Sequence, residues 1–259
     1  MGDEDTTTEA MLIDALQNIG WTYVKPDELQ SHREYSDVLN ETDLVNSLMK
    51  LNPSIERNPQ YADEVVSKLR AIISSSYSGG LVVANERFVS WMLNEQSMPF
   101  GKNGEHVTVR LIDYDNPENN QFIVSHQVMF PLHSKDGGKR FDIVLYINGM
   151  PVVVGECKTP TRPSISWVDG ALDIEDYERS DAASFFTPNV LNFATEGKFF
   201  RYGAIGMKAE MWGPWNYGCA SNEGTLKDVS RAVSSLFDKP LFIDIIKNYM
   251  LFSNDDNYR

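Results

Sequence analysis

Residues 141–158 read FDIVLYINGMPVVVGECK, and this stretch decides the fold of the chain around it. Two runs rich in β-branched and aromatic residues, Phe141–Ile147 and Pro151–Lys158, flank the dipeptide Asn148-Gly149. Asn-Gly between two such runs is the strongest short signal for a β-hairpin, because both residues tolerate the left-handed backbone of a tight turn. The second run contains three consecutive valines, a pattern typical of a strand buried on both faces. The stretch therefore predicts a hairpin inside a covered sheet.

The far end of this hairpin carries charged side chains, and the register of the turn decides whether they face one another. Side chains alternate faces along a strand, so Glu156 and Lys158 share a face. A regular two-residue loop puts Asp142 opposite Gly155, on the other face. A three-residue loop over 147–149, or an equivalent bulge, brings Asp142 to the face of Glu156 and Lys158. We predict that one of these two irregularities is present.

Two carboxylates and an amine on one face of a hairpin form a candidate catalytic set. Asp142 and Glu156, about one strand spacing apart, repel each other and attract a hard divalent cation such as Mg²⁺, with Mn²⁺ as the alternative. The main-chain carbonyl of Cys157 is a further candidate ligand. Such a cation polarises a phosphodiester and lowers the pKa of a water molecule, and Lys158 would orient that water or stabilise the transition state.

The competing interpretation of these residues is structural. Glu156 and Lys158 alone could form a solvated surface ion pair, which contributes little to stability. Charges that directly follow a buried apolar run are costly, however, unless a site makes use of them. This cost favours the catalytic interpretation.

The sequence outside the hairpin predicts helices before it and a mixture of elements after it. Apolar residues at helical spacing predict helices over residues 8–20, 38–50, 61–76 and 82–95, with a loop over 75–80. Runs of β-forming residues predict strands over 107–112 and 121–130, separated by a turn at 115–120. After the hairpin we predict a helix over 165–180, a strand over 199–207, and one or two helices over 226–252 interrupted near Pro240. This order predicts an α/β fold with a mixed central β-sheet flanked by helices.

Composition narrows the class of protein. The chain has 259 residues and a formal net charge of −14, the wrong sign for holding DNA by phosphate neutralisation alone. Its two cysteines, Cys157 and Cys219, belong to no Cys/His cluster, which argues against structural zinc and favours a reducing compartment, so we expect a cytoplasmic protein. No apolar run approaches the ~18 residues of a membrane span.

The pattern Asp142…Glu156-Cys157-Lys158 resembles that of the PD-(D/E)xK nucleases. A wider stretch is similar to the N-terminal endonuclease domain of the restriction (R, or HsdR) subunit of type I restriction-modification enzymes. The matching text comprises LIDYDNPENNQF at 111–122, SHQ at 125–127 and the hairpin through Pro160, with weaker similarity at 20–21, 51–53 and 201–206. The resemblance thus covers most of the chain.

This resemblance implies a domain organisation and an activity. It implies a helical N-terminal part at 1–100, a PD-(D/E)xK restriction-endonuclease-like core at 101–215, and a helical segment at 216–259 that leads toward a motor domain. It also implies a Mg²⁺-dependent type I site-specific deoxyribonuclease that cuts double-stranded DNA after ATP-driven translocation. The implied partners are methyltransferase and specificity subunits, the latter recognising the target. Because the chain contains no Gly-x-x-x-x-Gly-Lys-Ser/Thr phosphate loop, ATP would bind only in a motor region outside it.

Further site residues are implied by the same resemblance. Family members often carry a Gln-x-x-x-Tyr element on the helix after the Glu-x-Lys strand. Here Tyr177 fits this element, but Asp173 stands in the place of the glutamine, so its role is open. A carboxylate from an early helix often faces such a site, with Glu9 the first candidate and Glu64 the second. All four are also compatible with ordinary helix surfaces.

Two other functions remain open at this point. One is a non-catalytic docking module whose acidic surface binds a motor domain or another subunit. The other is a stand-alone PD-(D/E)xK nuclease of DNA repair or recombination. Metal binding that depends on Asp142 would separate an enzyme from a docking module.

Overall fold

The structure is a computed structural model that describes residues 5–34, 37–132, 137–158, 164–216 and 223–252. Within these residues a six-stranded sheet runs in the order β1-β4-β5-β6-β7-β8. Its strands are β1 (Thr22–Tyr23), β4 (Phe122–Pro131), β5 (Gly138–Ile147), β6 (Met150–Cys157), β7 (Leu191–Thr195) and β8 (Phe200–Gly203). The pairs β1/β4 and β6/β7 are parallel and the other neighbours antiparallel, which confirms the predicted mixed sheet and α/β class.

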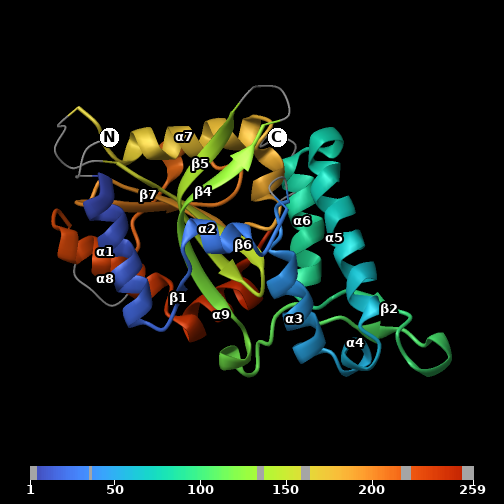
Figure 1. Cartoon of the computed structure of the whole chain (residues 1–259). Helices are drawn as coiled ribbons and strands as arrows, with labels where there is room; N and C mark the ends of the chain where they lie inside the picture. Colours follow the sequence, from blue (N-terminus) through green and yellow to red (C-terminus); the bar gives the residue numbers. More distant parts are fainter. Residues whose placement is uncertain (1–4, 35–36, 133–136, 159–163, 217–222, 253–259) are drawn as a thin grey trace.

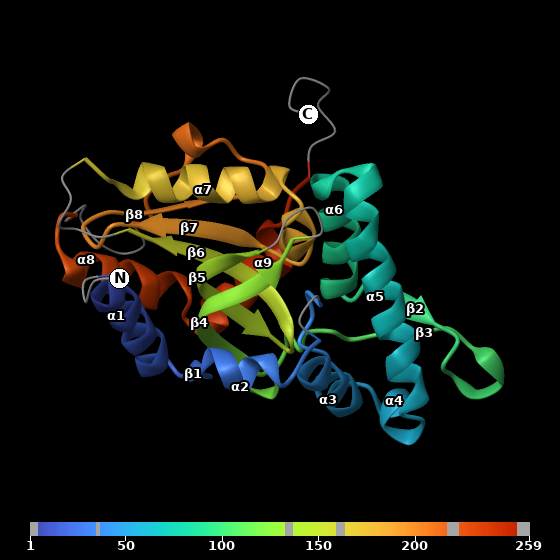
Figure 2. The ribbon, with the colours of Figure 1, turned by 45° about the horizontal axis from the view of Figure 1, so that its top comes forward.

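Helices cover both faces of this sheet (Figures 1 and 2). The helices before the hairpin are α1 (Asp5–Asn18), α2 (Pro26–Gln30), α3 (Glu41–Leu51), α4 (Pro53–Arg57), α5 (Gln60–Gly79) and α6 (Leu81–Met92). Those after it are α7 (Trp167–Arg179), α8 (Leu226–Leu236) and α9 (Lys239–Tyr249). Helix α7 lies along one face over β6 and β7, whereas α1, α8 and α9 lie on the opposite side and α3 to α6 stand beside the sheet.

The central strand β6 is buried along its whole length. The valines at 152–154 have no exposed surface, and β5 and β7 pair with β6 on its two edges. This confirms the interpretation of the apolar run as a strand covered on both faces.

The hairpin has a two-residue turn together with a β-bulge. Ile147 pairs with Met150, but the register shifts between Leu145 and Tyr146, because Leu145 pairs with Val153 whereas Tyr146 pairs with Pro151. Val152 is therefore the extra residue on β6. The predicted three-residue loop is wrong and the predicted equivalent, a bulge, is present. Beyond the bulge the shifted register places Asp142 opposite Glu156.

The hairpin turn is held by the loop that precedes β4. Asn148 and Gly149 both have positive φ, 51° and 81°, as a type I′ turn requires. The Asn148 amide donates at 2.8 Å to the main-chain oxygen of Leu111 and to Asn120 Oδ1, and Asn148 Oδ1 accepts from the N–H of Gln121. Asn120 of the 111–122 stretch thus has a structural role, because it helps to fix the turn.

Some predicted elements differ from the observed ones. The predicted loop at 75–80 is wrong up to Gly79, because α5 continues to that residue. Of the predicted strand at 107–112, only β3 (Val107–Thr108) is a strand, and it pairs with β2 (Ser97–Met98). The two strands that were not predicted in the main sheet are β1, which has two residues, and β7, which is buried throughout and shows no alternation. The break near Pro240 is confirmed, since α8 ends at Leu236 and α9 begins at Lys239. None of the helices in the described ranges is long and apolar enough to cross a membrane.

Candidate functional site

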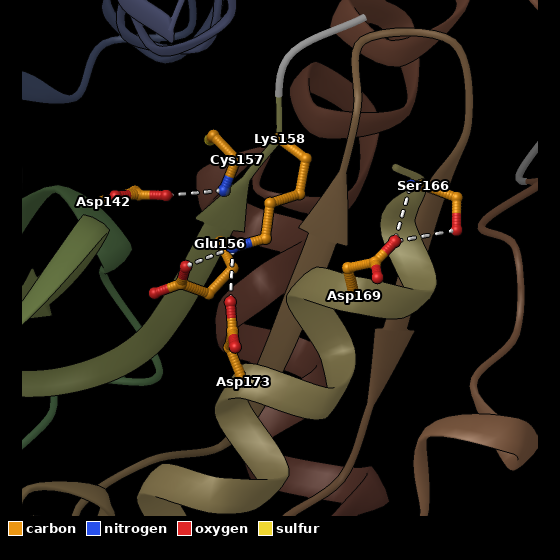
Figure 3. Close-up of polar contacts among 7 residues, drawn as sticks. All are labelled: Asp142, Glu156, Cys157, Lys158, Ser166, Asp169 and Asp173. Atoms are coloured by element: carbon orange, nitrogen blue, oxygen red, sulfur yellow. Dashed lines mark hydrogen bonds and ion pairs between the residues drawn. The ribbon is translucent and has the colours of Figure 1, made fainter. Parts of the chain in front are cut away.

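Asp142 on β5 and Glu156 on β6 meet at one end of the hairpin (Figure 3). They are 8% and 2% exposed, and each carboxyl group lies close enough to the other to influence its pKa. Asp142 Oδ2 also accepts the main-chain N–H of Cys157 at 2.9 Å, which ties the two strands together at this point. The bulge at Val152 thus brings both acids to one face, as the catalytic interpretation requires.

The Asp142–Glu156 pair is more stable with protons bound than with both carboxyl groups ionised. Burial, followed by the charge of Asp142, raises the pKa of Glu156 well above its ordinary value, and burial raises the pKa of Asp142. Glu156 Oε1 is buried and has no hydrogen-bond partner among the residues that the structure describes. A buried carboxylate oxygen without a partner is costly unless something outside the protein supplies the contact.

Lys158 follows β6 and supplies the nearest cation. Its main-chain N–H donates to Thr195 of β7 at 2.8 Å, and its ammonium Nζ lies 3.5 Å from Glu156 Oε2. The ammonium also donates a hydrogen bond to Asp173 on α7. Partial burial lowers the pKa of Lys158, but Asp173, Glu156 and Asp142 together outweigh burial and raise it, so the side chain is a cation.

Helix α7 brings Asp173 and Tyr177 toward this cluster. Gly170 allows the close approach, because a Cβ there would lie 3.2 Å from the Cβ atoms of Glu156 and Ala194. The ring of Tyr177 packs edge-on against Phe141. Burial, followed by the charges of Glu156, Asp173 and Asp142, raises the pKa of the Tyr177 hydroxyl, which therefore stays protonated.

Glu9 on α1 is buried and lies on the other side of the pair. It accepts a hydrogen bond from Gln127 at 3.3 Å. Burial is the main cause of the raised pKa of the Cys157 thiol, and the charge of Glu9 adds to it. Gln127 lies on β4 between His126 and Val128, which pair with Ile143 and Phe141 of β5. Its φ of 49° is a conformation that is strained in a strand and concentrated at functional sites. Glu64, the second candidate, is exposed on α5, which packs on other helices.

The donor set suits a hard cation. Among the described residues, no group of three or more His, Cys, Asp or Glu side chains is arranged to hold a metal ion, and the two acidic side chains that meet at this site are Asp142 and Glu156. Oxygen donors of this kind match Mg²⁺ and Mn²⁺, which keep several waters and need few protein ligands. The unpartnered Glu156 Oε1 fits such an ion. Asp113, in contrast, is used by its own turn, where it accepts from the N–H groups of residues 115 and 116.

Sequence reasoning did not find the contact between Lys158 and Asp173. The spacing placed Asp173 one turn before Tyr177 on a helix but carried no information about what that helix faces. Gly170 was the available signal, because a glycine in the middle of a helix often marks a close approach to another element.

Glu178 fastens the C-terminal part of α7. Its carboxylate accepts from the Asn192 amide at 3.0 Å and from the N–H of Gly206 at 2.9 Å. Burial raises the pKa of Glu178 to about 7, although the Gly206 hydrogen bond opposes the rise. Glu178 therefore joins the C-terminal part of α7 to β7 and to the main chain at Gly206.

We expect this carboxyl group to make stability depend on pH. Its pKa is higher in the folded chain than the 4.5 of free glutamate, so the stabilisation is complete below pH 4.5 and is lost as pH rises through about 7. Glu178→Gln should remove about 3 kcal/mol of this dependence, because the pKa rises from 4.5 in the free side chain to about 7 in the folded chain. Chemical denaturation at several pH values between about 5 and 8 measures it. Glu210→Gln, on an exposed residue, is the control, and an unchanged pH profile in Glu178→Gln would contradict the prediction.

Comparison with known proteins identifies similar chains. The family model described as "Type I restriction enzyme R protein N terminus" matches residues 1–210. The type I restriction enzyme HindI endonuclease subunit of Haemophilus influenzae is 27% identical over 95% of this chain, which covers 24% of that protein. A protein of Methanocaldococcus jannaschii provisionally named type I restriction enzyme MjaIXP endonuclease subunit is 28% identical over 61% of this chain and 15% of its own length. The chain thus spans a quarter or less of these relatives.

Proposed function

The chain belongs to the family of type I restriction enzyme R protein N termini, and from this premise we propose that it carries a metal-dependent endonuclease site. Asp142 and Glu156 are the metal ligands, the main-chain carbonyl of Cys157 is a further ligand, and Lys158 is the catalytic amine. The observation that carries the proposal is the convergence of two buried acids, one with an unpartnered oxygen, beside a lysine ammonium. The α/β fold with its mixed sheet agrees with a restriction-endonuclease-like core.

The proposed substrate and partners rest on the family resemblance and not on a contact within this chain. We propose that the substrate is double-stranded DNA and that cleavage follows ATP-driven translocation by a motor outside residues 1–259. Methyltransferase and specificity subunits would complete the complex in the cytoplasm. On this view residues 1–100 support the nuclease core at 101–215, and 216–259 connect it to the motor.

The residues of the site would divide the chemistry among them. Bound Mg²⁺ or Mn²⁺ would polarise the phosphodiester and lower the pKa of a water molecule, so that the water can lose a proton and attack the phosphorus. Asp142 and Glu156 hold the ion through carboxylate oxygens. The Lys158 ammonium orients the attacking water or stabilises the extra negative charge on the phosphorus oxygens. Tyr177, protonated and on the same helix face as Asp173, supplies a hydroxyl donor, and Glu9 stabilises the strand ends through Gln127.

Metal titration by calorimetry tests the proposal. The chain should bind Mg²⁺ and Mn²⁺, and Asp142→Ala should abolish this binding without unfolding the domain. Glu56→Ala on the exposed surface of α4 is the control and should bind as the unmodified chain does. If the unmodified chain takes up neither ion, or if Asp142→Ala binds normally, the site is not a metal-dependent nuclease centre, and a docking module becomes the better hypothesis.

The same titration should reveal a release of protons. Because the pKa values of Asp142 and Glu156 are both raised, a cation must displace protons from the pair before it binds. Metal affinity should therefore rise with pH until both acids are ionised. Calorimetry in buffers of different ionisation enthalpy counts the protons, and an affinity that is constant between about pH 6 and about pH 8 would contradict this expectation.

A further inference from the structure

The ammonium of Lys158 stands between two acids that belong to different elements (Figure 3). On one side is Glu156, 3% exposed at its side chain and 3.5 Å away. On the other is Asp173 of α7, 44% exposed, to which the ammonium donates a hydrogen bond. The lysine side chain itself is 21% exposed, so it bridges the buried pair and the surface of the helix.

A lysine in this position needs something to hold it. Its four-carbon chain has many rotamers, and fixing them costs free energy. Without Asp173 the closest remaining acid is Glu156, a proposed metal ligand, and the ammonium would compete with a cation for it. Once a cation is bound, two positive charges would lie side by side and repel each other.

We propose that Asp173 is a positioning residue, which holds the Lys158 ammonium beside the Asp142–Glu156 pair and away from the metal position. The inference rests on the proposed function, since it assigns Asp173 a role in that same site. Asp173 acts through Lys158 and needs no contact with the substrate or the ion. The negative charge of Asp173 offsets the repulsion between the Lys158 ammonium and a bound cation. It also keeps the ammonium beside the place where the attacking water would be.

The way in which both ends of helix α7 are held supports this role of Asp173. Helix α7 begins with a capping box, in which the side chains of Ser166 and Asp169 satisfy each other's main-chain N–H groups. Gly170 lets the helix approach Glu156, and Glu178 ties its other end to β7. Asp173 is thus held on a helix fastened at both ends, so its carboxylate can define a position for a flexible lysine.

The first experiment follows the ammonium directly in the metal-free chain. Nitrogen-detected or nitrogen-edited NMR observes lysine ammonium groups that are held in ion pairs, and Lys158→Arg assigns the signal. The signal should be present in the unmodified chain, move to a new chemical shift in Asp173→Asn as the ammonium turns to Glu156, and keep its position in Asp173→Glu, which restores the charge. Asp176→Asn, an exposed acid on the same helix, is the matched control and should leave the signal unchanged. A Lys158 signal whose chemical shift is the same in Asp173→Asn as in the unmodified chain would overturn the proposal.

The second experiment is a double-mutant cycle on Mn²⁺ affinity, measured by calorimetry. Asp173→Asn should weaken binding about tenfold when Lys158 is present, because the freed ammonium occupies Glu156. In Lys158→Ala the same change should weaken binding no more than about twofold, the effect of one distant charge. Equal effects in the two backgrounds would overturn the proposal even though the unmodified chain binds the ion. Absence of binding in the unmodified chain would instead refute the proposed function, and the NMR result still decides the role of Asp173.

Discussion

Replacing Glu156 by glutamine is expected to lower the rate of DNA cleavage by about 10³-fold or more, because an amide is a poor ligand for a hard cation and removes the charge of the pair. The variant should still fold, because glutamine keeps the volume of this buried side chain and carries no charge. The measurement is cleavage of plasmid DNA by the complete restriction complex that contains the variant subunit.

The same substitution should stabilise the folded chain at alkaline pH. The raised pKa of Glu156 means that the folded state is destabilised as pH rises through that pKa, and glutamine has no such ionisation. Thermal unfolding at neutral and alkaline pH measures the difference, which should grow with pH. Glu86→Gln, on the exposed surface of α6, is the matched control and should change neither activity nor stability. A folded Glu156→Gln variant that cuts DNA normally would refute the role of the acid pair.

Asp142→Ala and Lys158→Ala should abolish cleavage for different reasons. Asp142→Ala removes a ligand, so both metal binding and cleavage should be lost. Lys158→Ala leaves the acids in place, so metal binding should persist while cleavage is lost. Normal cleavage by a folded Lys158→Ala variant in the full complex would show that the amine has another function.

Replacing Gly149 by alanine is expected to lower the free energy of unfolding by about 4 kcal/mol or more. About 1 kcal/mol comes from the left-handed φ of 81°, which alanine adopts poorly. The rest comes from steric overlap, because the new Cβ would lie 2.4 Å from the main-chain oxygen of Asn40 and 2.6 Å from the nitrogen of Leu44. These main-chain atoms belong to the start of α3 and cannot move without displacing the helix. Chemical denaturation of the purified chain measures the loss.

Gly104 is the matched control for this prediction. Its φ of 80° is almost the same, but no atom lies within 4 Å of a Cβ placed there. Gly104→Ala should therefore cost only the conformational part, about 1 kcal/mol. If both variants lose the same stability, the contact between the hairpin turn and α3 does not contribute as we infer.

Local signals account for what could be predicted about the fold. The hairpin was predictable because Asn148 and Gly149 favour left-handed backbone whatever surrounds them. The amphipathic helices were predictable because the spacing of apolar residues depends only on helix geometry. Strand β7 was not, since a short strand covered on both faces has no alternation and differs little from any other apolar segment. Its place beside β6 is a parallel pairing across a long connection.

The candidate site divides in the same way. Glu156 and Lys158 share a face because side chains alternate along any strand, so this part of the site was already contained in three consecutive residues. Whether Asp142 joins them depends on one extra residue, Val152, since a regular pairing would turn the acid to the opposite face. Local preference for the turn does not decide where a bulge forms. Packing of both faces of β6 does.

The residues of this chain by themselves determined a hairpin with two acids and an amine near one end, within an α/β fold. Only the tertiary structure decided that the bulge unites Asp142 with Glu156, that α7 gives Lys158 a second acid in Asp173, and that Gln127 adopts a strained backbone within β4. The physical reason is the separation along the chain over which each interaction acts. Turn and strand preferences act between neighbours in the chain, whereas the burial that raises the pKa values of the acids and the approach of α7 come from elements that meet only when the sheet is assembled.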